Sequence, residues 1–67
     1  MTLADLKFVL RSEIGRVQDA VLFNLVDHKT IRDGGTIESI VTEFPNAEVR
    51  NLAAVGDKLV ICAKVYN

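Results

Sequence analysis

The sequence has very few of the residues that small proteins use for covalent cross-links or metal centres. Among its 67 residues there are one cysteine, one histidine, one proline and no tryptophan. A lone cysteine cannot form an intramolecular disulfide, and a structural zinc site would need ligands from another chain. The sequence therefore predicts no metal and no cofactor, and it favours a reducing, cytoplasmic location.

Long apolar runs and an excess of charge of one sign are also missing. No segment approaches the roughly 20 apolar residues of a membrane span, and residues 1–15 mix charges into what would be the apolar core of a signal peptide. Eight Lys and Arg stand against nine Asp and Glu, a formal net charge of −1. Phosphate neutralisation supplies most of the affinity of nucleic-acid binders. This charge balance therefore argues against a nucleic-acid partner, and the missing span argues against a membrane.

What the sequence does contain is enough apolar material for a folded domain. Hydrophobic residues make up 49% and charged residues 25% of the chain, which is the balance of a globular protein rather than a disordered one. At this length the chain is expected to form a single domain over 1–67 with a thin core. Small domains without disulfides or metals often depend on oligomerisation, so self-association is one expected mode of binding.

Two short helices are predicted from caps and apolar spacing. Thr2 is a suitable N-cap, and Asp5 a capping-box partner, for a helix over 3–13 that ends near Gly15. A second helix over 37–44 has apolar residues at i, i+3, i+4 and i+7 and stops before a proline.

Four strands are predicted for the rest of the chain. Residues 20–27 carry apolar residues on both faces, and a weak turn leads to a short return strand around Ile31. A final hairpin has strands over 47–54 and 59–66, with its turn at the Gly-Asp pair 56–57. The element order is α-β-β-α-β-β. We therefore expect an α+β fold with a small, mostly antiparallel four-stranded sheet and two short helices.

The strands 20–27 and 59–66 raise a question of coverage, because both are apolar on both faces. Two short helices can cover one face of a four-stranded sheet, but hardly both. If they cover one, the other is an exposed apolar patch of the kind that marks interaction surfaces. The alternative is that the helices straddle both faces and leave nothing open. The uncovered set that we predict to bind a partner comprises Leu22, Val26, Val60, Cys62 and Tyr66.

The stretch RDGGT at 32–36 has two glycines between a strand and a helix, as phosphate-binding loops do. It lacks the GxxxxGK[ST] and GxGxxG patterns, and the charge of Asp33 would repel a phosphate. We interpret the stretch as a hinge in which Gly34 or Gly35 takes a positive φ and Thr36 caps the second helix.

The sequence shows no convergent set of acid, base and nucleophile. His28 follows Asp27, but neighbours in a strand or turn point apart, and a nucleophile would have to come from elsewhere in the fold. Cys62, within VICAKV, is typical of core or interface packing rather than of a reactive thiolate. We therefore predict that the protein is not an enzyme.

The main alternative to a protein-binding module is a small nucleic-acid-associated regulator. Its candidate residues are Arg50, Lys58 and Lys64 along the final hairpin, interleaved with Glu48 and Asp57. Three such charges are more typical of a solvated edge that discourages strand pairing than of a nucleic-acid groove.

Three stretches, MTLADLKFVL, GTIESI and VRNLAAVGDKLVICAKV, resemble small uncharacterised accessory proteins of Gram-positive phages and integrative elements. Those proteins combine a short N-terminal helix, a strand, a G-T-x-E-E helix start and a terminal hairpin leading into D-x-L-V-I. Here Ser39 replaces the second acidic residue of the helix start. The resemblance brings no catalytic residues. It implies an accessory or inhibitory protein in the host cytoplasm that binds a host or viral macromolecule.

The leading interpretation is a non-enzymatic protein-interaction module. It would present one face of the sheet, with the surface of the first helix as a second candidate, to a protein partner or to its own copy.

Overall fold

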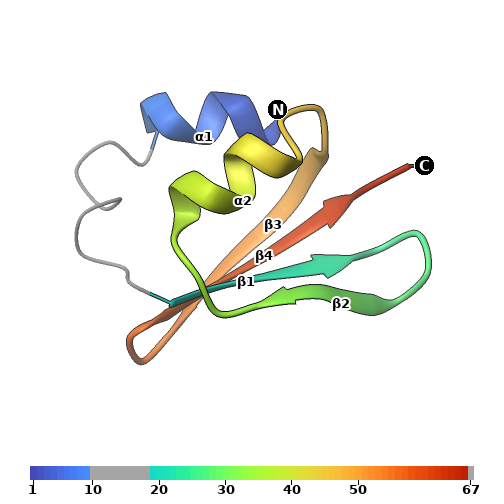
Figure 1. Cartoon of the computed structure of the whole chain (residues 1–67). Coiled ribbons are helices and arrows are strands. Elements are labelled where there is room, and N and C mark those ends of the chain that lie inside the picture. Colours follow the sequence, from blue (N-terminus) through green and yellow to red (C-terminus); the bar gives the residue numbers. More distant parts are fainter. Residues whose placement is uncertain (10–18, 67) are drawn as a thin grey trace.

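The computed structural model describes residues 1–9 and 19–66, and it places two helices on the same side of a four-stranded sheet (Figure 1). The predicted class, an α+β fold with two helices and four strands, is confirmed. Neither described helix is long and apolar enough to cross a membrane. In chain order the elements are α1 (Leu3–Val9), β1 (Asp19–Asn24), β2 (Lys29–Asp33), α2 (Ile37–Glu43), β3 (Glu48–Val55) and β4 (Lys58–Lys64).

The sheet is mixed rather than antiparallel throughout. Its strands lie in the order β2-β1-β4-β3, and the central pair, β1 with β4, is parallel. Only the two outer pairs, β1 with β2 and β3 with β4, are antiparallel hairpins. The reason is that α2 carries the chain from one edge strand to the other. The two hairpins then meet through β1 and β4, which run in the same direction, so the expected antiparallel pairing does not extend to the centre.

Helix α1 begins where the sequence predicts. The carboxylate of Asp5 accepts hydrogen bonds from the backbone N–H of Thr2 at 3.0 Å and from its hydroxyl at 3.2 Å, so Asp5 acts as the capping-box acid. These bonds to Thr2 hold the pKa of Asp5 below its usual value. The predicted continuation of this helix over 10–13 and its stop near Gly15 lie outside the described residues.

The RDGGT stretch is the predicted hinge. Gly34 and Gly35 have φ of +97° and +106°, a region that other residues rarely adopt. Thr36 is the N-cap of α2, and its hydroxyl accepts the backbone N–H of Ser39 at 3.0 Å. The glycines also bond back to β1, because Gly34 N–H donates to the carbonyl of Ala20 and Ala20 N–H donates to that of Gly35. The hinge therefore fixes the start of α2 against the first strand.

The core is a single layer between the helices and one face of the sheet. Leu3 and Leu6 of α1 and Ile37 and Ile40 of α2 are fully buried, and α2 also contributes Val41. The sheet side of this layer consists of Ala20, Leu22, Val49, Leu59, Ile61 and Ala63. Every second residue of β1 and β4 therefore faces the helices.

Asn24 explains why two strands end earlier than the sequence predicts. β1 ends at Asn24 rather than at residue 27, and β4 ends at Lys64 rather than at residue 66. The buried Asn24 amide accepts the N–H groups of Val26 and Val65 at 3.0 and 3.1 Å, and it donates to the Val65 carbonyl at 3.1 Å. This side chain replaces the next rung of the ladder and turns the chain away from the sheet.

Candidate functional site

The sheet has one face that neither described helix covers. Away from the helices, β1 presents Val21 and Phe23 while β4 presents Val60 and Cys62. Val21 lies beside Val60 and Phe23 beside Cys62, so the four side chains form two adjacent rows. All four are half-buried, and both helices lie on the other side of the sheet (Figure 1). We call these four residues the open-face cluster.

Small and polar residues border the open-face cluster on the edge strands. On β3, Ala53 lies beside Val60 and Asn51 beside Cys62. On β2, Asp33 lies beside Val21 and Thr30 beside Phe23. The cluster is therefore an apolar centre two strands wide with a more polar margin, which is how protein-binding patches are commonly built.

Opposite charges mark the two ends of the open face. At one end Asp19 of β1 lies beside Lys58 of β4, and the Lys58 ammonium is 3.9 Å from the Asp33 carboxylate. At the other end Lys64 lies beside Glu48 of β3. Because each end carries both acidic and basic side chains, the open face has no net field of one sign. The charged side chains at its ends can instead pair with individual groups of opposite charge on a partner.

Two of the five predicted partner-binding residues, Val60 and Cys62, lie in the open-face cluster. The prediction that Leu22 shares their face is wrong, because Leu22 has 0% of its surface exposed beneath the helices. The parallel register places Leu22 beside the buried Ile61 and Val21 beside Val60. The physical reason is that β1 and β4 are not joined by a turn. Alternation within one strand shows which of its residues share a face, but it does not show which residues of the other strand lie on the same side of the sheet.

Sequence reasoning missed Val21 and Phe23, although a signal for them was present. In β1, Asp19 lies on the same face as Val21 and Phe23, because every second residue of a strand shares a face. In β4, Lys58 and Lys64 lie on the same face as Val60 and Cys62. Charged residues avoid burial, so the alternate set that carries charge is the one that faces solvent. Applied to both strands, that criterion selects Val21 and Phe23 rather than Leu22.

The other two predicted residues lie outside the open-face cluster. Val26 is 47% exposed in the turn between β1 and β2. Tyr66 is 69% exposed, follows the end of β4 and lines a pocket beside the loop after α2. The early end of both strands at Asn24 and Lys64 removes Val26 and Tyr66 from the alternation on which the prediction depended.

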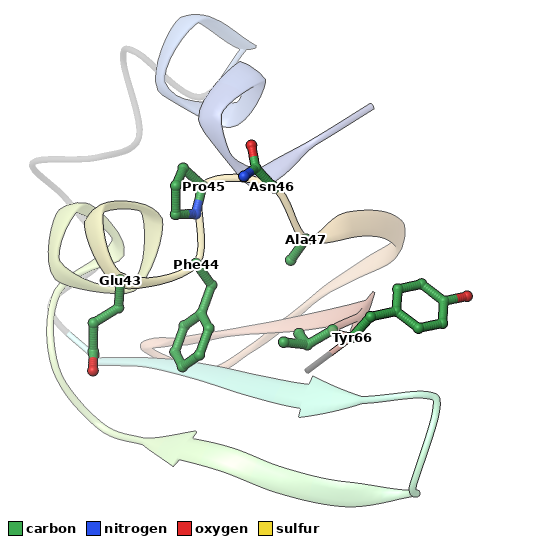
Figure 2. A pocket seen from close by; sticks show the side chains of 7 residues that line it. Glu43, Phe44, Pro45, Asn46, Ala47 and Tyr66 are labelled. Carbon is green, nitrogen blue, oxygen red and sulfur yellow. The ribbon is translucent and has the colours of Figure 1, made fainter.

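The pocket at Tyr66 has a volume of about 360 Å³ and lies between the end of α2 and the segment after β4 (Figure 2). The Tyr66 ring extends away from Phe44 in Figure 2 rather than closing over it. The pocket is lined by Glu43, Phe44, Pro45, Asn46, Ala47, Val65 and Tyr66. The one carboxylate among these residues, that of Glu43, already forms an ion pair, so the lining offers no acid–base pair.

That ion pair joins β2 to α2 on the covered side of the sheet. The guanidinium of Arg32 donates to both carboxylate oxygens of Glu43, from Nε to Oε2 at 2.7 Å and from Nη2 to Oε1. The hydrogen bond from Arg32 lowers the pKa of Glu43 below its usual value, and that to Glu43 raises the pKa of Arg32. A bidentate pair of this kind positions the edge strand against the helix.

The residues considered for catalysis do not form a reactive set. His28 is exposed in a turn with φ of +58°, and its ring meets the edge of Phe23 with centroids 6.5 Å apart. Cys62 is half-buried among the apolar residues of the open face. Within residues 1–9 and 19–66, no three His, Cys, Asp or Glu side chains are grouped as metal ligands.

The three basic residues considered for nucleic-acid binding each have an acidic neighbour. Arg50 donates to Glu48 at 3.0 Å, and Lys58 lies 3.9 Å from Asp33. Lys64 is in register with Glu48. These carboxylates offset the positive charge where a phosphate backbone would have to bind.

Comparisons with known proteins found no relative: no protein-family model matches the chain, and neither does any curated protein or solved structure.

Proposed function

We propose that this protein is a non-enzymatic interaction module that binds a protein partner through the open-face cluster. The observation that carries the proposal is the set of four adjacent apolar side chains of β1 and β4, which the helices leave uncovered. Contact with a partner would remove this apolar surface from water, which contributes about 25 cal/mol for each Å² buried. Charged residues at the two ends of the open face would favour one orientation of the partner; they are Asp19, Lys58, Lys64 and Glu48.

A protein partner is favoured over a nucleic acid by the character of the open face. Bases can stack on Phe23, but phosphate binding needs uncompensated positive charge. The basic residues nearest the face, Lys58 and Lys64, are each flanked by a carboxylate. An apolar surface with balanced charges is better suited to a protein surface of similar composition.

The resemblance to accessory proteins of phages and integrative elements adds a biological setting to this proposal. It suggests a host or viral protein as the partner and inhibition of that partner as one outcome. This part of the proposal depends on the resemblance alone, whereas the binding surface depends on the geometry of β1 and β4.

The proposal is tested by placing a charge in the open-face cluster and measuring capture of protein partners from a cell lysate. We expect Val60→Lys and Val21→Lys to lose the partners that the wild-type chain captures, because a lysine ammonium would have to be desolvated in the contact. The matched control is Val9→Lys, since Val9 is 62% exposed on α1. Circular dichroism and urea unfolding establish that each variant is folded.

Two results of that experiment would count against the proposal. One is capture by Val60→Lys and Val21→Lys that equals capture by the wild type. The other is loss of capture in Val9→Lys as well, which would place binding on the helices. If the captured material is nucleic acid and its binding falls steeply with added salt, the nucleic-acid alternative replaces the proposed function.

A further inference from the structure

We propose that the partner of the open face is a second copy of the same chain, bound face to face about a two-fold axis parallel to β1 and β4. This inference rests on the proposed function, because it names the partner for the same surface. It follows from the pattern of charge and size on the open face, which is complementary to itself in one orientation.

The residues of the open face form rows that run across β1 and β4. The register gives three rows, in which Asp19 lies beside Lys58, Val21 beside Val60 and Phe23 beside Cys62. The proposed two-fold axis lies in the plane between the two copies, parallel to the strands and midway between β1 and β4. Rotation about it leaves each row at the same position along the strands and places β1 of one copy opposite β4 of the other. Asp19 of one copy then faces Lys58 of the other, and the same contact occurs a second time by symmetry.

The apolar rows match in the same orientation. Val21 faces Val60 of the second copy, and Phe23 faces Cys62 of the second copy, an aromatic ring against a polarisable sulfur. Two sheets that pack face to face keep their strands roughly aligned at a separation of about 10 Å, which this axis permits. All four residues of the open-face cluster are covered, and the charged row lies at the end of the contact.

A two-fold axis perpendicular to the strands is excluded by charge. Centred on the apolar rows, it would place Lys58 of each copy against Lys64 of the other, two like-charge contacts. Moving that axis by one row would instead press Lys58 against Cys62 or Lys64 against Val60, where the ammonium would lose its water. The strand-parallel axis places Asp19 against Lys58 and the apolar rows against apolar rows, and Lys64 lies beyond the last row, past the end of β1.

The size of the open face predicts a weak dimer. Four strands about 4.8 Å apart, each offering about six residues at 3.3 Å, give roughly 400 Å² of flat area per copy. The total of roughly 800 Å² lies below the 1,200–2,000 Å² of stable complexes and near the range of transient ones. The dimer should therefore form in the micromolar to sub-millimolar range and dissociate on dilution.

The test is a charge-reversal experiment read by sedimentation velocity at low ionic strength, at concentrations up to about 1 mM. We expect the wild-type chain to change from monomer to dimer across this series. Asp19→Lys alone would set two ammonium groups against each other at each end contact, and Lys58→Asp alone would set two carboxylates against each other. Each variant should therefore dimerise at least about ten-fold more weakly. An equimolar mixture of the two variants restores both opposite-charge contacts and should dimerise like the wild type.

Recovery in the mixture is the decisive result, because each variant also carries like charges side by side within its own chain. Repulsion within a chain persists when the two variants are mixed. A like-charge contact between chains is instead replaced by a contact between opposite charges. Val60→Lys should abolish the dimer and Val9→Lys should leave it unchanged. As a readout that needs no variant, alkylation of Cys62 should slow as the wild-type concentration rises, since the dimer covers the thiol.

The proposal is overturned if the wild type stays monomeric to about 1 mM, or if the mixture dimerises no better than its components. Alkylation of Cys62 at a rate independent of concentration would overturn it as well. A monomeric wild type whose capture of another protein still depends on Val60 would remove the dimer and leave the proposed function standing. A dimer that survives Val60→Lys would overturn the inference too, because self-association would then use another surface.

Discussion

The two faces of the central strand pair differ far more in burial than in composition. On one face Leu22 of β1 lies beside Ile61 of β4, and both have 0% of their surface exposed. On the other, Val21 lies beside Val60, one residue along each strand, and both remain only half-buried. Burial in this chain is therefore decided by where the helices pack and not by hydrophobicity alone.

The shortness of the two described helices explains why they leave the second face of the sheet open. A two-layer α+β domain covers one side of its sheet with helices, and α1 and α2 together cover no more than that (Figure 1). A strand with one solvated face usually has polar residues there. The open face instead keeps four apolar side chains between its charged ends, and this departure makes it a candidate binding surface.

The largest expected effect comes from truncating neighbouring residues on the two faces. Leu22→Ala should lower the free energy of unfolding by about 2–5 kcal/mol, because it leaves a cavity in the buried core. A domain of this size has about 3–10 kcal/mol in total, so the variant should be largely unfolded or close to it. Val21→Ala should cost about 1 kcal/mol or less, since this side chain already meets solvent. Urea unfolding midpoints measure both.

The comparison between the faces fails if the two variants lose similar stability. Ile61→Ala and Val60→Ala repeat the test on β4 and guard against a local peculiarity of β1. A large loss in Val60→Ala that disappears on dilution would indicate that the open face is buried in the dimer rather than within the chain.

A second test concerns the residue where the covered face ends. Asn24→Ala removes three hydrogen bonds and leaves the N–H groups of Val26 and Val65 and the Val65 carbonyl without that partner. Unsatisfied groups of this kind cost about 1–3 kcal/mol, so the unfolding midpoint should fall by a smaller amount than in Leu22→Ala. Amide hydrogen exchange at Val65 should accelerate more than the global change requires. Unchanged protection at Val65 would show that water replaces the side chain at no cost.

Much of this fold could be predicted from local chemistry, and the failures have one physical origin. The features that depend on neighbours in the sequence are confirmed: Asp5 as the capping-box acid at the start of α1, the Thr36 cap, the RDGGT hinge and the Gly-Asp turn at 56–57. The pairing of β1 with β4 joins segments that the hinge, α2 and β3 separate, and it was predicted neither in direction nor in register. Leu22 was therefore assigned to the wrong face, while Val60 and Cys62 lie on the face that their strand's two lysines mark as solvated.

The glycine hinge offers a third test, because it directs α2 onto the covered face. Gly34→Ala should cost about 1–2 kcal/mol, the penalty of a positive φ for an L-residue. Apart from the glycine and its two chain neighbours, no heavy atom of the described residues lies within 4 Å of the position that a Cβ would occupy, so the cost is conformational rather than steric. D-alanine at position 34, introduced by chemical synthesis, favours positive φ and should restore the wild-type midpoint. Equal losses with L- and D-alanine would point to a steric cause instead.

The smallest expected effect is on the ion pairs that β2 makes on either side of the sheet. On the covered side, Arg32 and Glu43 form a bidentate pair that lowers the pKa of Glu43. A carboxylate whose pKa is lower in the folded state stabilises the fold above its unfolded-state pKa, and this contribution is lost as the pH falls through the folded-state pKa. On the open side, Asp33 and Lys58 meet at 3.9 Å through one contact.

A double-mutant cycle at neutral and acidic pH distinguishes the two pairs. The cycle of Arg32→Gln with Glu43→Gln should show a small favourable coupling at neutral pH that vanishes once Glu43 is protonated. The cycle of Asp33→Asn with Lys58→Gln should show less coupling at neutral pH, because an exposed pair with one long contact contributes little. Equal coupling in the two cycles would mean that the geometry of the covered-side pair adds nothing to stability. The difference between the faces would then be confined to their apolar residues.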